Sequence, residues 1–218
     1  MDASPRDFAG RHTAPRIISG VVLAALVSFL LWPALVGATG SSPGSLHQTS
    51  TEPSFTVGLD AQMKTLWRAI EADAPALGQT VFFPRGAYLQ MKAGAIVDPG
   101  GDYTRRLIGF FDLDLAAYHR TIDVPRAATF LRVGVNPADA AWIPAGACEN
   151  KIGYWHIPGV RLVFEKGGKV ESVEVASLIS WRGVWYIVHL GPNPRPTDAG
   201  TVDGFLTGPG RPGPAGGC

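Results

Sequence analysis

Three residues of the chain carry side chains suited to nucleophilic catalysis: Cys148, His156 and His189. A neighbouring imidazole activates a thiol, so together they suggest a thiol–imidazole site. Their spacing does not support this idea, because such partners meet in space and not in sequence. The competing interpretation is a Cys148–Cys218 disulfide, the usual state of two cysteines in an oxidising compartment. A Cys218 that is free or paired with another molecule is the third possibility.

An aromatic segment between glycines and prolines is the most unusual stretch of the chain. It contains Tyr154, Trp155 and His156, and the sequence predicts that it lies in a loop. Such a loop can line a ligand pocket or contact a partner, or it can plug the open end of the fold, which we favour. Arg161 and Arg182, at the ends of predicted strands, could pair with an anionic group. With His189, these residues form the candidate binding site.

Composition argues against two other classes of function. The formal net charge is +1 and Lys and Arg do not cluster, so a nucleic-acid partner is not expected. The two cysteines do not form a CxxC motif and no HExxH motif accompanies them, so no metal site is expected. No cofactor is expected either.

A three-stranded meander over residues 160–190 must position most of these side chains. Gly167-Gly168 and Arg182-Gly183 place glycine where tight hairpin turns need a positive φ. Between and after the turns, β-branched and aromatic residues alternate with the others, as expected of half-buried strands.

The N-terminal part of the chain predicts a membrane span. Residues 1–16 form a polar tail that carries three arginines, and residues 17–38 are almost wholly apolar. These 22 residues are long enough to cross a bilayer at about 1.5 Å per residue. The arginines favour a cytoplasmic N-terminus, with the rest of the chain outside the cytoplasm. The alternative is a signal peptide cleaved after Ala38, which would make the protein secreted.

Two segments rich in small residues flank the predicted domain at residues 55–190. Residues 39–54 have the Ser, Thr, Gly and Pro content of a disordered linker. In residues 191–218, Gly and Pro make up 14 of 28 positions, and we interpret this segment as a mobile tail.

Within the domain, helices are predicted before strands. Apolar residues recur at helical spacing over residues 58–72 and 103–122, and Asp102 is placed to cap the second helix. Residues 79–94 are apolar but broken by Pro84 and Gly86, and could be a short strand or an irregular covering segment. A further strand is predicted at residues 129–135.

The order of elements predicts an α+β fold with helices on one face of a curved antiparallel sheet. This order resembles the cystatin-like roll of nuclear-transport-factor-2-like domains over residues 55–190. The chain also resembles uncharacterised secreted or membrane-anchored actinobacterial proteins in two segments, SWRGVWYIVHL and CENKIGYWHIPG.

The resemblance implies that any catalytic groups would lie inside the cone between sheet and helices. The candidates there are Asp112, Asp114, Tyr118, His119 and His189. Asp112 and Asp114 flank the apolar stripe of their helix, so we expect them to be solvated. His189 is expected to be a hydrogen-bonded residue of the sheet more often than a base.

We therefore expect a non-enzymatic binding or assembly protein, held in a membrane by one helix and displaying its domain outside the cytoplasm. An envelope protein is a possible partner. One alternative is a small hydrolase or isomerase with its site near His156 and His189. The other is a carrier that encloses an apolar ligand in a hollow cone.

Overall fold

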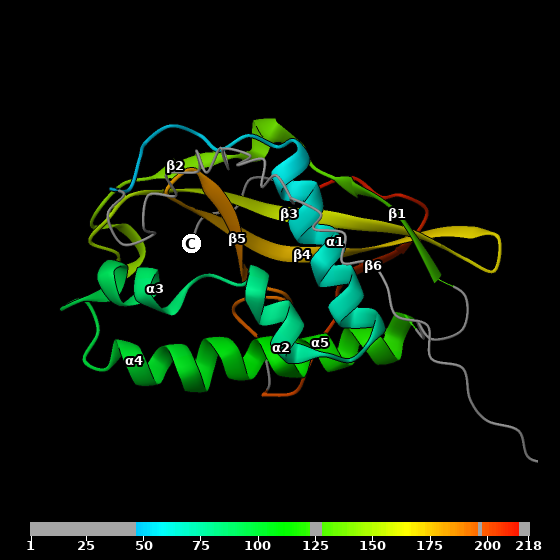
Figure 1. The fold of residues 1–218 in the computed structure, drawn as a ribbon, viewed down its shortest axis with the longest axis horizontal. Coiled ribbons are helices and arrows are strands. Elements are labelled where there is room, and N and C mark those ends of the chain that lie inside the picture. Colours follow the sequence, from blue (N-terminus) through cyan, green and yellow to red (C-terminus); the bar gives the residue numbers. More distant parts are fainter. Residues whose placement is uncertain (1–46, 123–127, 196–197, 214–218) are drawn as a thin grey trace, which may run out of the picture. The chain divides into compact units, whose positions relative to one another are not determined.

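The helices precede the sheet along the chain, which confirms the predicted α+β class (Figure 1). The structure, a computed structural model, describes residues 47–122, 128–195 and 198–213. All of these belong to the unit that begins at Ser41. Among the described residues, no helix has the length and apolar character that a membrane crossing needs. The predicted span at residues 17–38 lies outside the described residues.

The first helix, α1 (Val57–Glu71), is confirmed close to its predicted bounds. Its apolar stripe packs into the core and consists of Leu59, Met63, Leu66, Trp67 and Ile70. A short helix, α2 (Pro75–Gly78), and a 3-10 turn, η1 (Gln79–Val81), follow. Gly78 is needed here because a Cβ atom would lie 2.8 Å from the ring of Phe111 on a neighbouring helix.

The ambiguous segment at residues 79–94 combines an extended piece with a helix. Phe82 forms a parallel bridge with Ile187, and the amide of Phe83 donates to the Ile187 carbonyl at 2.8 Å. After Pro84 the chain turns into α3 (Arg85–Lys92). Proline favours an extended backbone before this helix and cannot extend a sheet ladder, which explains why the strand stops after one bridge.

The second long helix begins four residues earlier than predicted. It runs through α4 (Pro99–Asp102), a π-helical stretch η2 (Tyr103–Ile108) and α5 (Gly109–Ile122). Asp98 caps it by accepting from the amide of Gly101 at 2.8 Å. The prediction that Asp102 is the cap is therefore wrong, and its carboxylate instead pairs with Arg106, one turn further along the helix.

The sheet is antiparallel and curved, with strand order β1-β3-β4-β5, β2 beside β3 and β6 beside β4. Its strands are β1 (Ala128–Gly134), β2 (Ala141–Ile143), β3 (Tyr154–Lys166), β4 (Lys169–Trp181), β5 (Val184–His189) and β6 (Asp203–Thr207). The predicted meander and both of its turns are confirmed, with positive φ at the two central residues of each turn. The strand β3 starts at Tyr154, so the prediction that the aromatic segment is a loop is wrong.

The C-terminal segment is folded against the domain from Gly191 to Gly213, apart from residues 196–197, which are not described. Its strand β6 pairs with β4, and Arg195 forms an ion pair with the buried Asp114. The prediction of a mobile tail is wrong for this part, because composition alone does not reveal distant partners. Residues 214–218 lie outside the described residues.

The last part of the predicted linker is also bound to the sheet. Gln48 donates to the carbonyls of Gly153 and Ser180 and accepts from the amide of Arg182. Residues 48–53 therefore lie along one end of the sheet, where a disordered linker was predicted. Residues 39–46 lie outside the described residues.

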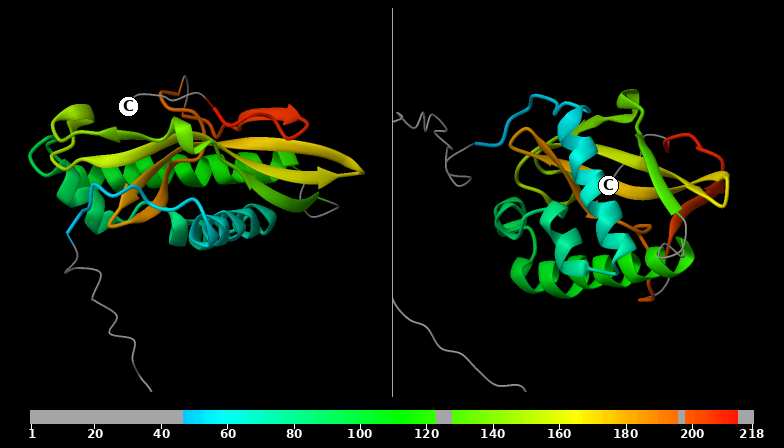
Figure 2. Two further views of the ribbon diagram at one scale, coloured as in Figure 1. Left: turned by 90° about the horizontal axis from the view of Figure 1, so that it is seen from above. Right: turned by 45° about the vertical axis from the view of Figure 1, so that its right-hand side comes forward.

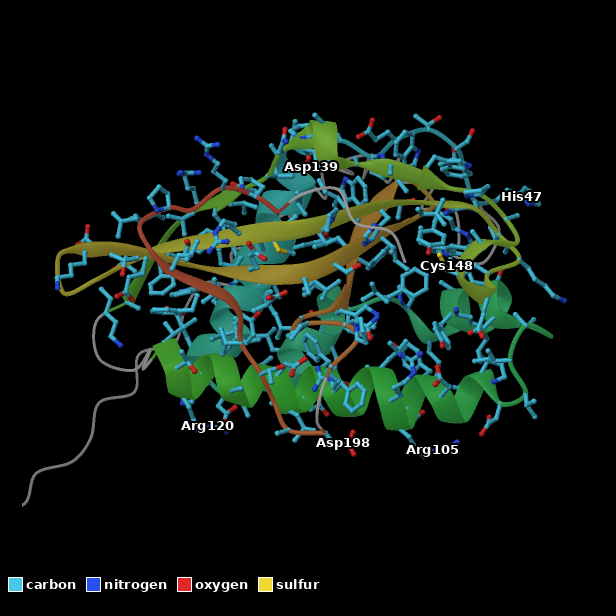
Figure 3. The ribbon with its side chains drawn as sticks, turned by 180° about the vertical axis from the view of Figure 1, so that it is seen from behind. His47, Arg105, Arg120, Asp139, Cys148 and Asp198 are labelled. Atoms are coloured by element: carbon cyan, nitrogen blue, oxygen red, sulfur yellow. The ribbon has the colours of Figure 1, made fainter. Side chains whose placement is uncertain are left out.

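Helices and strands enclose the core between them (Figures 1 and 2). The helix α1 crosses the β3–β4 hairpin, and β6 lies on the other side of that hairpin. Trp67 of α1 packs on Phe130 and Phe164 of the sheet, with ring centroids 5.7 and 5.2 Å apart. The long helix runs along the sheet, and Arg105 and Arg120 point outward from it (Figure 3).

Candidate functional site

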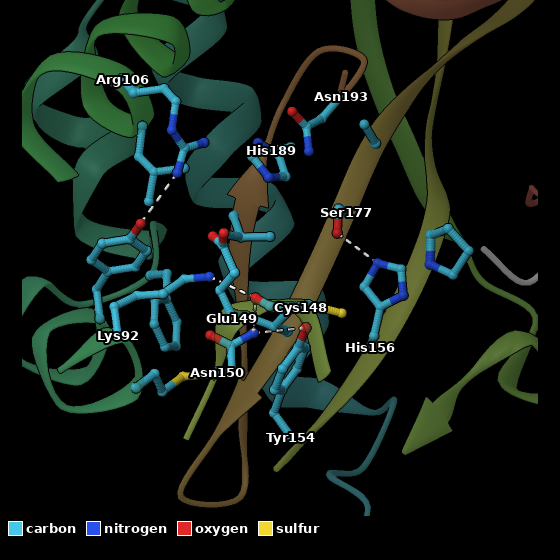
Figure 4. A pocket seen from close by; sticks show the side chains of 18 residues that line it. Lys92, Arg106, Cys148, Glu149, Asn150, Tyr154, His156, Ser177, His189 and Asn193 are labelled. Atoms are coloured by element: carbon cyan, nitrogen blue, oxygen red, sulfur yellow. Dashed lines mark hydrogen bonds between the residues drawn. The ribbon is translucent and has the colours of Figure 1, made fainter. Parts of the chain in front are cut away.

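A cavity of about 440 Å³ lies between the sheet and the helices. Its walls come from α3, the π-helical stretch η2, residues 148–150, and the strands β3, β4 and β5 (Figure 4). Glu149 and Asn193 line it and are exposed, so they mark its opening. This volume falls within the range of small-molecule sites in proteins.

Three predicted site residues meet in this cavity: Tyr154, His156 and His189. Because side chains alternate along a strand, Tyr154 and His156 of β3 share the face that looks into the cavity. His156 contributes a ring nitrogen that lies 2.7 Å from the Ser177 hydroxyl on β4.

The position of His189 depends on a β-bulge between β4 and β5. Ser177 pairs with His189 and Leu178 with Ile187, which leaves Val188 as an extra residue. A bulge interrupts the alternation of side chains, and both Val188 and His189 line the cavity although they are neighbours in sequence.

Trp155 faces away from the cavity. Its indole donates to the carbonyl of Ser50 at 2.8 Å and packs edge-on against Trp142. Trp155 therefore holds the segment that precedes α1, and the structure separates it from the predicted binding site.

Arg161 also lies outside the cavity, in the interior of the protein. Its side chain is 1% exposed, forms an ion pair with Glu174 and donates to the hydroxyl of Ser172. The expectation that it lies at a strand end is wrong, since β3 begins seven residues before it. Its cationic group is satisfied within the protein.

Arg182 occupies the β4–β5 turn, away from the cavity. Its guanidinium lies over the ring of Trp181, 5.1 Å from the ring centroid, and its amide is bound by Gln48. The structure thus gives Arg182 a role in fixing the N-terminal segment to the sheet.

Cys148 lines the cavity on a tight turn, which brings it into the same cavity as His156 and His189. The backbone is left-handed at both Cys148 and Glu149, after a left-handed Gly146. Cys218 lies outside the described residues, so the predicted Cys148–Cys218 disulfide stays a prediction.

Tyr88 and Arg106 line one wall of the cavity and form a cluster with Asp102 behind it. Arg106 donates through Nε and Nη2 to the two carboxylate oxygens of Asp102, at 2.7 and 2.6 Å. The hydroxyl of Tyr88 donates to Asp102 and accepts from Arg106 Nη2 at 3.2 Å. Hydrogen bonding from Arg106 lowers the pKa of Asp102, and burial raises the pKa of Tyr88 far above its ordinary value.

The sequence contains only part of the signal for this cluster. Asp102 and Arg106 have the i,i+4 spacing of a helical ion pair, so their contact could have been predicted from the sequence. The contact with Tyr88 could not, because it depends on how α3 packs against the long helix.

Lys92 supplies a second cation at the end of α3. It donates to the carbonyl of Cys148 at 2.8 Å, and Asn150 donates to the same oxygen at 3.0 Å. Burial is the main cause that lowers the pKa of Lys92, and the nearby carboxylate of Glu149 opposes this shift. Lys92 is thus a cation that is incompletely solvated.

The pKa of His189, which also lines the cavity, is strongly shifted. Burial, and after it the positive charges of Arg106 and Arg195, lower its pKa to about 3. Its imidazole is therefore neutral at physiological pH, with one donor and one acceptor nitrogen. Figure 4 shows it between Arg106 on one side and Ser177 and His156 on the other.

The other candidates from the long helix have structural roles. Asp114 is buried and binds Arg195 together with the amides of Gly191 and Thr201, so the expectation that it is solvated is wrong. Tyr118 is buried and donates to the Leu190 carbonyl at 2.9 Å. His119 contacts the carbonyl of Ile70 at 2.7 Å, and Asp112 accepts from Gln79.

Within residues 47–122, 128–195 and 198–213, no three His, Cys, Asp or Glu side chains gather as metal ligands would. Comparison of the chain with protein-family models, with curated proteins and with solved structures finds no match.

Proposed function

We propose that this protein binds a small organic ligand in the cavity between its sheet and its helices. The observation that carries the proposal is a hollow of about 440 Å³ with both apolar and polar walls. Phe83, Met91 and Leu107 offer apolar contacts, and Lys92, Arg106 and His189 offer hydrogen bonds. An apolar lining with a few convergent polar groups is typical of ligand sites.

The proposal includes the architecture that surrounds the site. The α+β order, the curved sheet and the cavity beneath it support a cystatin-like roll. The apolar residues 17–38 support an N-terminal membrane anchor, and the arginines before them support an extracytoplasmic domain. The protein would then bind its ligand on the outer side of a membrane.

Binding is favoured over catalysis by the protonation states of the polar groups. A general base works best when its pKa lies near the working pH, and the pKa of His189, about 3, is far below it. The carboxylate of Asp102 is engaged by Arg106 and Tyr88. The neutral ring of His189 is therefore suited to holding a ligand by hydrogen bonds, and Asp102 is suited to positioning Arg106.

The test is a ligand-observed NMR screen of the full-length protein in lipid nanodiscs against fragment-sized aromatic acids, amides and alcohols. In the variant Ala176→Trp an indole would fill the cavity from β4, and Val188→Phe is a second way to fill it. Ala138→Trp adds the same side chain at an exposed position outside the cavity and is the matched control.

We expect fragments to bind the wild type and Ala138→Trp, and to be lost in the filled variants that keep the wild-type circular dichroism spectrum. The same fragments binding equally to all four proteins would show that the cavity is not the binding site. An absence of bound fragments in the wild type would contradict the proposed function.

A further inference from the structure

We infer that the wall formed by Lys92, Arg106 and His189 binds a carboxylate group of the ligand. This inference rests on the proposed function and adds the chemical class of the ligand, an organic monoacid with an apolar body. The three residues come from α3, from η2 and from the end of β5, and they meet only in the folded protein.

Arg106 has donors left for a ligand after its contacts within the protein. A guanidinium carries five N–H groups. Asp102 and Tyr88 use the donors on Nε and Nη2. The two N–H groups on Nη1 have no partner among the described residues, although the side chain lines the cavity and is 40% exposed.

Lys92 has spare donors as well. Its ammonium has three N–H groups, and its one hydrogen bond within the described residues goes to the carbonyl of Cys148. Since burial removes part of its solvation, an anion in the cavity would restore the favourable interactions that Lys92 has lost.

His189 completes the wall with a neutral imidazole. No hydrogen bond joins its ring to another described side chain or backbone group, while Arg106 and Arg195 make its surroundings positive. A neutral imidazole can donate one N–H to a carboxylate oxygen in such surroundings. The positive charges of Arg106, Arg195 and Lys92 around this ring would attract an anionic group and repel a cationic one.

The charges around the wall favour a monoanion over a dianion such as a phosphate monoester. Asp102 already offsets the charge of Arg106, and Glu149 lies close enough to Lys92 to oppose its pKa shift. The remaining positive potential is therefore modest. The apolar contacts of Phe83, Met91 and Leu107 add a preference for a hydrocarbon or aromatic body.

The experiment compares 4-phenylbutyrate with its neutral isostere 4-phenylbutanamide. Equilibrium dialysis of the full-length protein in lipid nanodiscs measures both affinities, and empty nanodiscs correct for partition into lipid. We expect the wild type to bind the acid at least about tenfold more tightly, since charge-assisted hydrogen bonds are stronger than neutral ones.

Two groups of variants decide whether this wall is responsible. Arg106→Gln, Lys92→Gln and His189→Gln should each reduce the preference for the acid and leave binding of the amide nearly unchanged. Arg105→Gln is the matched control. Arg105 immediately precedes Arg106 on the same helix, is 74% exposed and points outward (Figure 3).

Each outcome separates the inference from the proposed function. Equal affinity for acid and amide in the wild type would overturn the inference and leave the proposed function standing. A preference for the acid that survives in all three wall variants, or that disappears in Arg105→Gln, would place the carboxylate elsewhere. If neither probe binds, the inference fails, and the fragment screen decides the proposed function separately.

Discussion

His189 shows at the scale of a single residue how the cavity controls chemistry. Its pKa of about 3 in the folded protein lies well below the ordinary value of 6.5, chiefly because burial disfavours the charged ring. In the unfolded chain the His189 ring becomes protonated near pH 6.5, whereas in the folded protein it stays neutral until the pH approaches 3. The neutral ring therefore contributes fully to stability above pH 6.5, and the contribution is lost as the pH falls towards 3.

This difference predicts a pH dependence of stability. As the pH falls from 6.5 to 3, protonation of His189 in the unfolded chain should lower the free energy of unfolding by up to about 1.4 kcal/mol for each pH unit. Urea unfolding of the wild type and of His189→Gln over this range isolates the effect, because both share the other titrating groups. Identical slopes for the two proteins would show that His189 titrates normally.

Arg161 gives a second prediction at this scale. It is buried and paired with Glu174, so Arg161→Met leaves a partly buried carboxylate without its partner. We expect a loss of about 3 kcal/mol in unfolding free energy, measured by urea denaturation. Arg132→Met, at an exposed position on β1, should change it by less than about 0.5 kcal/mol. A similar small loss for Arg161→Met would mean that the buried pair is not formed.

At the scale of elements, the C-terminal segment depends on α5. Asp114 accepts from Arg195 and from the backbone of Gly191 and Thr201, and Tyr118 accepts from the amide of Asp203 at 3.0 Å. These contacts place residues 201–207 where β6 can pair with β4.

Asp114→Asn should therefore release β6 while the rest of the sheet stays folded. The variant keeps the shape of the side chain and removes the charge that binds Arg195. We expect faster hydrogen exchange at the amides of residues 201–207 and unchanged protection in β3. Asp112→Asn, on the same helix, is the control. Unchanged protection of residues 201–207 in Asp114→Asn would show that β6 is held by strand pairing alone.

Elements whose structure depends on neighbouring residues were predictable. The stripe of α1 and the two glycine turns of the meander follow from local spacing, and the structure confirms them. The start of β3 was missed because Pro158 and Gly159 are residues typical of loops. Both lie within the strand, where Gly159 has a positive φ. The fold of the C-terminal segment depends on Asp114, far away in sequence, and no local pattern indicates it.

The candidate site was only half predictable for the same reason. Tyr154, His156 and His189 were identified because large aromatic and titratable residues are conspicuous in a sequence. Lys92 and Arg106 look like ordinary helical cations, and only the packing of α3 against the long helix turns them towards the cavity.

At the scale of the whole molecule, the proposal places the cavity outside the cytoplasm. A phosphatase that is active only outside the cytoplasm, fused after Cys218, should be active, because the arginines before residue 17 favour a cytoplasmic N-terminus. Replacing Arg6, Arg11 and Arg16 with Glu should reduce this activity. A fusion that is inactive, while a cytoplasmic fluorescent reporter at the same position is bright, would contradict the proposed topology.

The central claim is that the cavity holds an organic acid, and the most direct test is an experimental structure of the full-length protein with 4-phenylbutyrate. We predict density for the ligand in the cavity, with its carboxylate within hydrogen-bond distance of Arg106 Nη1 and the His189 ring. A cavity filled by the protein's own side chains, or a ligand bound only at the outer surface, would contradict the claim.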